Sequence, residues 1–166
     1  MRFADGTYAE GAIALCEVQG YAYEAAVSGA ALLDGFDRAG GDDLRAWAQG
    51  LAERFRAAFW CGTDTDEPYP ALAVDGSGRR VDALSSNIGH LPGTGLLNLE
   101  EEWRVAQRVT SPALDSGYGL RTMSTRDAAY APLSYHCGSV WPHDTAIVVD
   151  GPVSYTHLTL PTNREV

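Results

Sequence analysis

The chain contains no lysine, and positive charge of any kind is scarce. All 12 basic residues are arginine, against 22 acidic residues, so the 166 residues carry a formal net charge of -10. Nucleic acids and anionic membrane surfaces are bound through clustered positive charge. The composition therefore argues against both as partners of this protein.

Cysteine is equally sparse, and long apolar runs are missing. The three cysteines, Cys16, Cys61 and Cys137, form no CxxC pair, which is typical of reduced thiols in a cytosolic protein. The opening MRFADGTYAEG lacks the apolar core of a signal peptide, and no run of about 18 apolar residues occurs. We therefore expect a cytoplasmic protein that is neither secreted nor inserted into a membrane.

Two segments near the N-terminus have helical patterns. Residues 12–36 are apolar nearly all round, as in a helix that is buried on most sides. Residues 42–60 carry a single apolar stripe at helical spacing, formed by Leu44, Trp47, Leu51, Phe55 and Phe59. With the turn RAGG between them, the two segments predict a hairpin of one buried and one half-exposed helix.

A second, less regular pair of helices is predicted farther along the chain. Residues 64–84 hold two prolines and the turn DGSG, so we expect a loop or a small β-hairpin there. Residues 82–97 contain proline and several glycines, which predicts a short inner helix. Residues 98–111 predict an outer helix that begins at Asn98, with Glu101 completing the cap.

The C-terminal part continues the alternation of helix and loop. Residues 112–125 favour an extended segment, and a third inner helix is expected to start near Trp141 and Pro142, because proline suits a first helical turn. We therefore expect residues 1–151 to be all-α, with long loops and a little β. Residues 152–166, PVSYTHLTLPTNREV, contain neither alanine nor glycine and are expected to be a non-native tail that resembles adapter read-through.

Polar side chains within the expected inner helices are candidates for ligand contacts. Glu17 and Gln19 lie in an otherwise apolar run, where they either face solvent or point into a cavity and bind a hydroxyl-rich ligand. The ring of Trp141 could stack on a sugar while His143 and Asp144 bind its hydroxyls. Core packing for Trp141 and a helix N-terminal charge for Asp144 are the competing interpretations.

The same region holds residue types that bind metals. His136, Cys137, His143 and Asp144 are close in sequence, but the His-x6-His spacing matches none of the compact zinc patterns. An isolated cysteine such as Cys137 is more often buried and inert than nucleophilic. We therefore expect no metal and no cofactor. Arg121 could bind sugar hydroxyls, hold a carboxylate or form a structural salt bridge.

Four segments, taken in order, closely resemble one enzyme family. They are ALCEVQGYAYEAA, ALSSNIGHLPGTGLL, LDSGYGLRTMST and YHCGSVWPHDTAIVV. The resemblance is to the C-terminal catalytic domain of bacterial glycogen-debranching-type enzymes, the amylo-α-1,6-glucosidase family of the six-hairpin glycosidases, and it covers about residues 2–151. It implies an (α/α)6 barrel with the active site at its mouth, of which this chain would be a fragment of about two and a half hairpins.

The resemblance also implies a chemistry and a set of binding residues. Such enzymes hydrolyse α-1,6-linked glucosyl branches of α-glucans with inversion, using a general acid and a general base about 6.5–9.5 Å apart. Both carboxylates are expected outside these residues, so the chain alone would be inactive, with Asp144 and then Glu17 as the weak catalytic candidates within it. The expected substrate-binding residues are Glu17, Gln19, Tyr21, Arg121, Thr122, His136, Trp141, His143 and Asp144.

Two alternatives stay open beside this interpretation. A non-catalytic helical carbohydrate-binding or scaffold module would form a compact fold in which the inner helix faces are covered. A metal-dependent hydrolase would need a bound metal and is the weaker of the two. A partial barrel would instead leave apolar helix flanks without neighbours, which predicts self-association.

Overall fold

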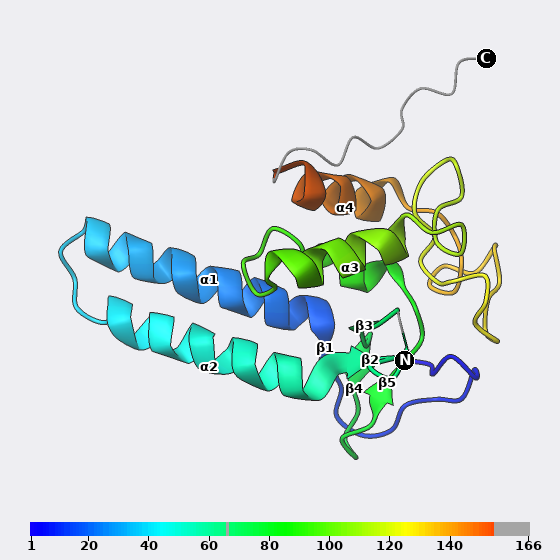
Figure 1. Ribbon diagram of the computed structural model, residues 1–166, viewed down its shortest axis with the longest axis horizontal. Helices are drawn as coiled ribbons and strands as arrows, with labels where there is room; N and C mark the ends of the chain where they lie inside the picture. Colours follow the sequence, from blue (N-terminus) through cyan, green and yellow to red (C-terminus); the bar gives the residue numbers. More distant parts are fainter. Residues whose placement is uncertain (66, 155–166) are drawn as a thin grey trace.

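A long helical hairpin forms one end of the molecule, and loops and short strands form the other. The computed structural model describes residues 1–65 and 67–154. Helices α1 (Cys16–Gly35) and α2 (Gly41–Phe59) lie antiparallel, and their connecting turn is far from the strands and the N-terminus (Figure 1). The hairpin predicted from the two apolar patterns is therefore confirmed.

The packing within the hairpin depends on residue size. The buried positions of α1 are small, namely Cys16, Gly20, Ala26 and Ala30, whereas α2 buries Phe55 and Phe59, whose rings stack at 4.6 Å. The predicted stripe of α2 is only partly correct, because Trp47 is exposed.

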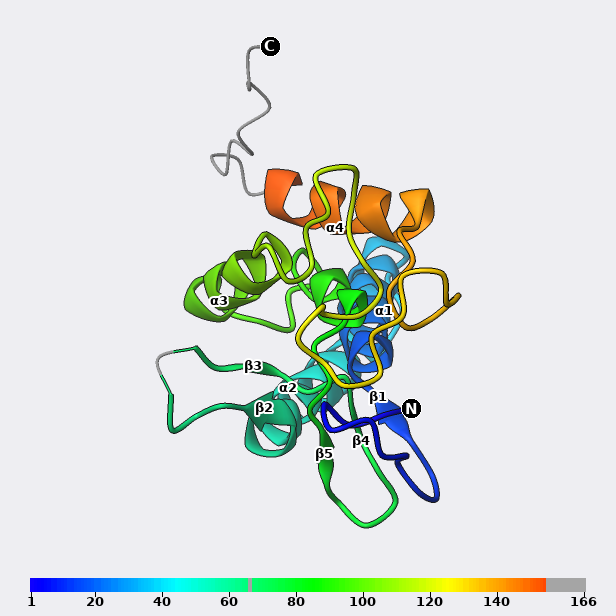
Figure 2. The same cartoon turned by 90° about the vertical axis from the view of Figure 1, so that its right-hand side faces the viewer.

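Helix α1 differs from its prediction in two respects. It begins at Cys16 rather than at residue 12, because Ala14–Leu15 form strand β1 and hydrogen-bond to another strand. It is also not buried on most sides, since several of its apolar side chains are exposed: Val18, Tyr21, Val27 and Leu32. Figures 1 and 2 show that α2 lies along one side of α1.

Two small antiparallel sheets pack beside the base of the hairpin. Strand β1 (Ala14–Leu15) pairs with β4 (Ala73–Val74), which pairs with β5 (Arg80–Val81), and β2 (Trp60–Cys61) pairs with β3 (Tyr69–Pro70). The β4–β5 turn is closed by the Asp75 carboxylate, which accepts hydrogen bonds from the backbone of Ser77 and Arg79. The small β-hairpin predicted within residues 64–84 is confirmed.

The second helical pair is asymmetric. Helix α3 (Leu99–Val109) has the predicted cap, since Asn98 accepts from the Glu101 amide at 2.9 Å and Glu101 accepts from the Asn98 amide at 2.8 Å. The inner helix predicted over residues 82–97 is reduced to a 3-10 helix, η1 (Ser86–His90). No right-handed helix continues through Gly93 and Gly95, whose φ angles of 88° and 80° lie in the left-handed region.

The last helix and the main core complete the fold. Helix α4 (Pro142–Ser154) begins at Pro142, as predicted. The main apolar core joins α2, η1, α3 and α4, through residues that include Phe55, Ile88, Val105 and Val148. A smaller core lies between the N-terminal segment and the three-stranded sheet.

Several sequence-based expectations concern the ends and the surface. The expected non-native tail, residues 152–166, lies outside the described residues from residue 155 on, so this expectation stays a prediction. All three cysteines are free thiols, as expected. None of the described helices combines the length and the apolar character that crossing a bilayer requires. The expected self-association stays a prediction. Phe36, at the end of the hairpin, is one exposed apolar side chain that could take part in it.

Candidate functional site

The candidate site is a polar cluster at the end of the molecule where the loops gather. Helix η1 contacts both α1 and α4, and the first turns of α1 and α4 reach the same region (Figure 2). Each of these first turns carries one acidic residue, Glu17 in α1 and Asp144 in α4. Negative charge is stabilised at a helix N-terminus, so both carboxylates are placed favourably.

Side chains of the 3-10 helix hold both carboxylates. Glu17 Oε1 accepts a hydrogen bond of 2.7 Å from Asn87 Nδ2, and the Asn87 oxygen accepts one of 3.0 Å from Ser85 Oγ. Asp144 Oδ2 accepts a 2.6 Å hydrogen bond from the buried Ser86 hydroxyl. A hydroxyl-to-carboxylate bond of this length belongs to the strong, charge-assisted class, which fixes the orientation of the Asp144 carboxylate.

A tyrosine and a histidine extend the cluster. Tyr21 Oη lies 2.6 Å from His90 Nδ1, and the other ring nitrogen, Nε2, lies 3.5 Å from Asp144 Oδ1. Burial raises the pKa of the Tyr21 hydroxyl, and the nearby charges of Glu17 and Asp144 raise it further. Tyr21 therefore keeps its proton and is available as a hydrogen-bond donor at neutral pH.

Small residues allow the three elements to approach so closely. A Cβ atom on Gly89 of η1 would lie 2.5 Å from Val148 Cγ2 of α4, which is far inside van der Waals contact. A Cβ atom on Gly20 of α1 would lie 3.1 Å from Leu91 Cδ2. Glycine at these two positions therefore determines the spacing at which Glu17, His90 and Asp144 meet.

The cluster combines predicted residues with others that the sequence did not single out. Glu17, Tyr21 and Asp144 were predicted to bind substrate, and the structure brings them together. Ser86, Asn87 and His90 were missed as site residues. A signal was present, because the segment SSNIGH places these polar side chains among the buried residues of an expected inner helix, where polar groups need partners.

Three other predicted residues bond mainly to backbone. Gln19 Nε2 donates to the Leu15 carbonyl at 3.1 Å, and Arg121 Nη1 donates to the Asp115 carbonyl at 2.5 Å. Thr122 Oγ1 accepts from the Gly138 amide at 2.9 Å. The backbone carbonyl of Thr122 also accepts a hydrogen bond of 3.3 Å from the Ser86 amide, so the loop that contains Thr122 is bonded to the first residue of η1.

The remaining predicted residues lie on or beside α4. Trp141, His136 and Tyr135 form an aromatic group, in which the Tyr135 ring meets the Trp141 ring edge to face at 4.2 Å. Trp141 Nε1 donates to Ser139 Oγ at 3.0 Å, so the polar atom of the indole is already bonded within the loop. His143 and His136 are exposed. Tyr135, which is also exposed, was not predicted.

Metal ligands do not gather in the residues that the structure describes. Across residues 1–65 and 67–154 there is no group of three or more histidine, cysteine or acidic side chains placed to hold an ion.

Burial raises the pKa of the Cys16 thiol, which donates to Glu17 Oε2 at 3.5 Å. This thiol is therefore protonated and unreactive at neutral pH.

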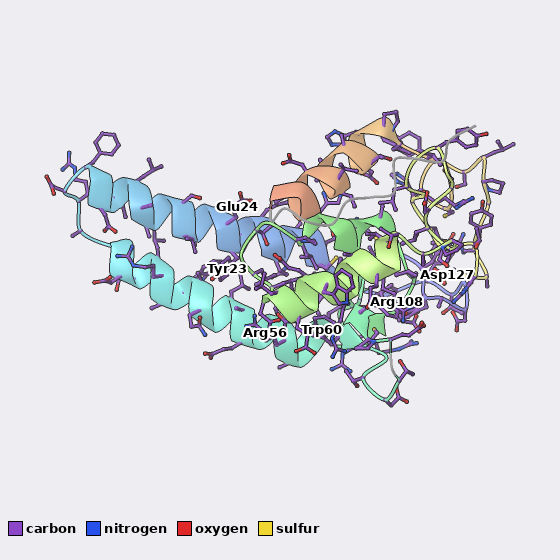
Figure 3. All side chains as sticks on the ribbon, turned by 45° about the horizontal axis from the view of Figure 1, so that its top comes forward. Tyr23, Glu24, Arg56, Trp60, Arg108 and Asp127 are labelled. Atoms are coloured by element: carbon purple, nitrogen blue, oxygen red, sulfur yellow. The ribbon has the colours of Figure 1, made fainter. Side chains whose placement is uncertain are left out.

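A carboxyl with a raised pKa lies outside the cluster. Asp127 is located among the loops, far from the α1–α2 turn (Figure 3). Its Oδ2 accepts a 2.9 Å hydrogen bond from the Leu84 amide, while Asp82 Oδ1 nearby accepts one of 2.9 Å from the Ala4 amide. Burial raises the pKa of Asp127 to about 6; the Leu84 bond lowers it, and the Asp82 charge adds to the rise.

Comparisons with known proteins identify the fold and leave the family open. No protein-family model matches the chain, and no curated protein matches it. Among solved structures, the chain is similar to neutral trehalase from Saccharomyces cerevisiae, with a TM-score of 0.64 and 15% sequence identity. The match covers 86% of this chain and 28% of the trehalase chain.

At this identity the likeness shows the fold alone. It confirms the expected fold class, a mainly helical portion of a larger barrel of helical hairpins, which is the six-hairpin type of fold. It does not test the debranching type of activity or the role of any single residue. Those expectations stay predictions.

Proposed function

We propose that this chain is part of a glycoside hydrolase that acts on α-glucans, of the glycogen-debranching, amylo-α-1,6-glucosidase type, and that the polar cluster binds one glucosyl unit. The observation that carries the proposal is the meeting of Glu17, Tyr21 and Asp144 through the side chains of η1. Glu17 and Tyr21 belong to α1 and Asp144 belongs to α4, two helices that are far apart in sequence. Helix capping alone does not explain why these side chains meet at one place beside η1.

The chemistry of the cluster fits a sugar. Sugars present adjacent hydroxyls, each of which donates and accepts, and they are recognised by carboxylate acceptors combined with hydroxyl and imidazole groups. Asp144 and Glu17 each have oxygen lone pairs beyond those used by Ser86 and Asn87. The Tyr21 side chain is 43% exposed, so the cluster is open to solvent on that side. The exposed rings of Tyr135 and His136 offer apolar faces for stacking.

The uncovered helix faces favour this proposal over a self-contained binding or scaffold module. Such a module would cover its inner helices, whereas Val18 and Val27 of α1 and Val149 of α4 are exposed. Following the resemblance, we place the general acid and the general base of the inverting reaction outside these residues. In this proposal Glu17 and Asp144 orient the sugar and do not carry the proton transfers.

The test is a binding titration on the full chain. Panose contains one α-1,4 and one α-1,6 linkage, and we expect saturable binding of panose, followed by NMR or calorimetry, and none of cellotriose. Asp144→Asn and Glu17→Gln should each weaken panose binding about tenfold or more, the usual cost of losing a hydrogen bond to a charged group. Asp43→Asn, which changes an exposed carboxylate on α2, is the matched control and should bind as the unchanged protein does.

Two results would contradict parts of the proposal separately. Absence of panose binding would remove the sugar-binding role of the cluster. Release of glucose from a branched dextrin by this chain alone would refute the placement of the acid and base outside it, and loss of that activity in Asp144→Asn would then assign catalysis to Asp144.

A further inference from the structure

His90 has two ring nitrogens that face different partners, and this asymmetry fixes where its proton lies. Nδ1 faces the Tyr21 hydroxyl at 2.6 Å, and Nε2 faces the Asp144 carboxylate at 3.5 Å. A neutral imidazole carries one N–H and one bare lone pair, and the partner of one nitrogen decides the state of the other.

Only one of the two neutral forms is favourable at both ends. If Nδ1 carried the proton, the lone pair of Nε2 would point at a carboxylate oxygen, and two negative charge densities would face each other. If Nε2 carries the proton, its N–H points at Asp144 and the bare Nδ1 accepts the proton of Tyr21. The side chain of His90 is 11% exposed, so water does little to screen this difference.

We infer that His90, held by Tyr21 as the Nε2–H tautomer, is a positioning residue that orients the Asp144 carboxylate for its ligand. At 3.5 Å the contact is longer than a standard hydrogen bond, so the N–H acts on Oδ1 mainly as an oriented dipole. Ser86 holds the other oxygen, Oδ2, at 2.6 Å. Both holding groups belong to η1, and they fix the plane of the carboxylate from two sides.

The charged groups around this unit are consistent with the assignment. Glu17 and Glu24 of α1 and Asp144 of α4 surround the Tyr21 hydroxyl, and all three disfavour its ionisation. The O–H bond of a protonated Tyr21 points either at His90 Nδ1 or at another acceptor. The 2.6 Å separation from Nδ1 favours donation along this line.

The first test needs no ligand. In the full chain, 15N NMR of the histidine rings at a pH where the ring is neutral separates protonated from bare nitrogens. We expect His90 to be protonated at Nε2, and we expect Tyr21→Phe to shift the ring toward a mixture of both tautomers. Tyr118→Phe, which alters a fully exposed tyrosine, should leave the signals unchanged. A predominant Nδ1–H tautomer in the unchanged protein would overturn the inference.

The second test separates positioning from simple packing, and it rests on the proposed sugar binding. A glutamine side chain places its amide nitrogen where His Nε2 lies, whereas asparagine reaches only the Nδ1 position. We expect His90→Gln to keep panose affinity within about twofold and His90→Asn to lose about three- to tenfold, the range of one ordinary hydrogen bond. Equal losses in both variants, with unchanged unfolding midpoints, would overturn the positioning role. If the unchanged protein does not bind panose, the proposed function fails, and the tautomer result still decides the inference.

Discussion

Asp127 offers a quantitative prediction, because its environment makes the folded state bind a proton more readily than the unfolded state does. The pKa of this carboxyl is raised to about 6, with burial as the main cause. An aspartate in an unfolded chain has a pKa of about 3.9. The difference of about two units corresponds to about 3 kcal/mol, and because the side chain is only half buried, solvent reduces this to about 1–3 kcal/mol.

The direction of the effect follows from which state is protonated. Above pH 6 both states carry the charge, and the folded state bears the full cost of keeping it away from water and near Asp82. As the pH falls through about 6, the folded state takes up a proton before the unfolded state does, so the free energy of unfolding increases. Below about pH 4 both states are protonated and the gain is complete.

The perturbation is Asp127→Asn, which removes the charge and keeps an oxygen that can accept from the Leu84 amide. We expect the variant to be more stable than the unchanged protein by about 1–3 kcal/mol at pH 7.5, and this advantage to shrink toward zero at pH 4.5. Urea unfolding at both pH values measures the two differences. Comparing the variant with the unchanged protein at each pH cancels the contributions of other groups, such as Glu102, whose pKa is also raised by burial.

Asp43→Asn is the control, because it removes an exposed carboxylate on α2 and should show no pH-dependent difference. A variant at position 127 that is less stable than the unchanged protein at pH 7.5 would refute the reasoning. So would an advantage of equal size at both pH values, since that would mean that the charge of Asp127 is not its source.

Two further predictions concern the positions that shape η1 and α3. Asn98→Ala should lower the free energy of unfolding by about 1 kcal/mol, because it leaves the Glu101 amide without its cap. Leu99→Ala, at an exposed site nearby, is the control and should have a smaller effect. Urea unfolding of both variants measures the difference. Gly89→Ala should cost about 1–3 kcal/mol, because the new Cβ atom would lie 2.5 Å from Val148 Cγ2. The same change made in a Val148→Ala background should cost less. Gly35→Ala is the control, because a Cβ atom there meets no other atom within 4 Å. Equal costs of Gly89→Ala in both backgrounds would show that the clash with Val148 is not the cause.

Local patterns in the sequence predicted the elements whose causes are themselves local. The Asn98–Glu101 cap, the start of α4 at Pro142 and the turn of the β4–β5 hairpin depend on residues within a few positions of one another. The stripe of α2 predicted which face of that helix is buried at Leu51, Phe55 and Phe59. These predictions succeeded because capping, turn chemistry and helical spacing need no knowledge of the rest of the fold.

Errors arose where distant residues decide the local structure. Residues 12–15 have a helical composition, but Ala14 and Leu15 gain backbone hydrogen bonds from strand β4, so the helix starts later. Helix α1 was predicted to be buried on most sides, but Val18, Val27 and Leu32 are exposed, since apolar composition does not reveal which neighbours are present. Trp47 shows the same limit for a single side chain, because its position in the stripe predicted burial and the structure leaves it exposed.

For the candidate site, the sequence by itself determined which residue types were available and suggested Glu17, Tyr21 and Asp144 as members. Only the tertiary structure decided that η1 connects them, because the contacts of Glu17 with Asn87 and of Ser86 with Asp144 each span more than fifty positions in the chain. It also decided that Arg121 bonds to carbonyls. The physical reason is that a hydrogen bond between distant residues depends on the packing of whole helices, which no local pattern specifies.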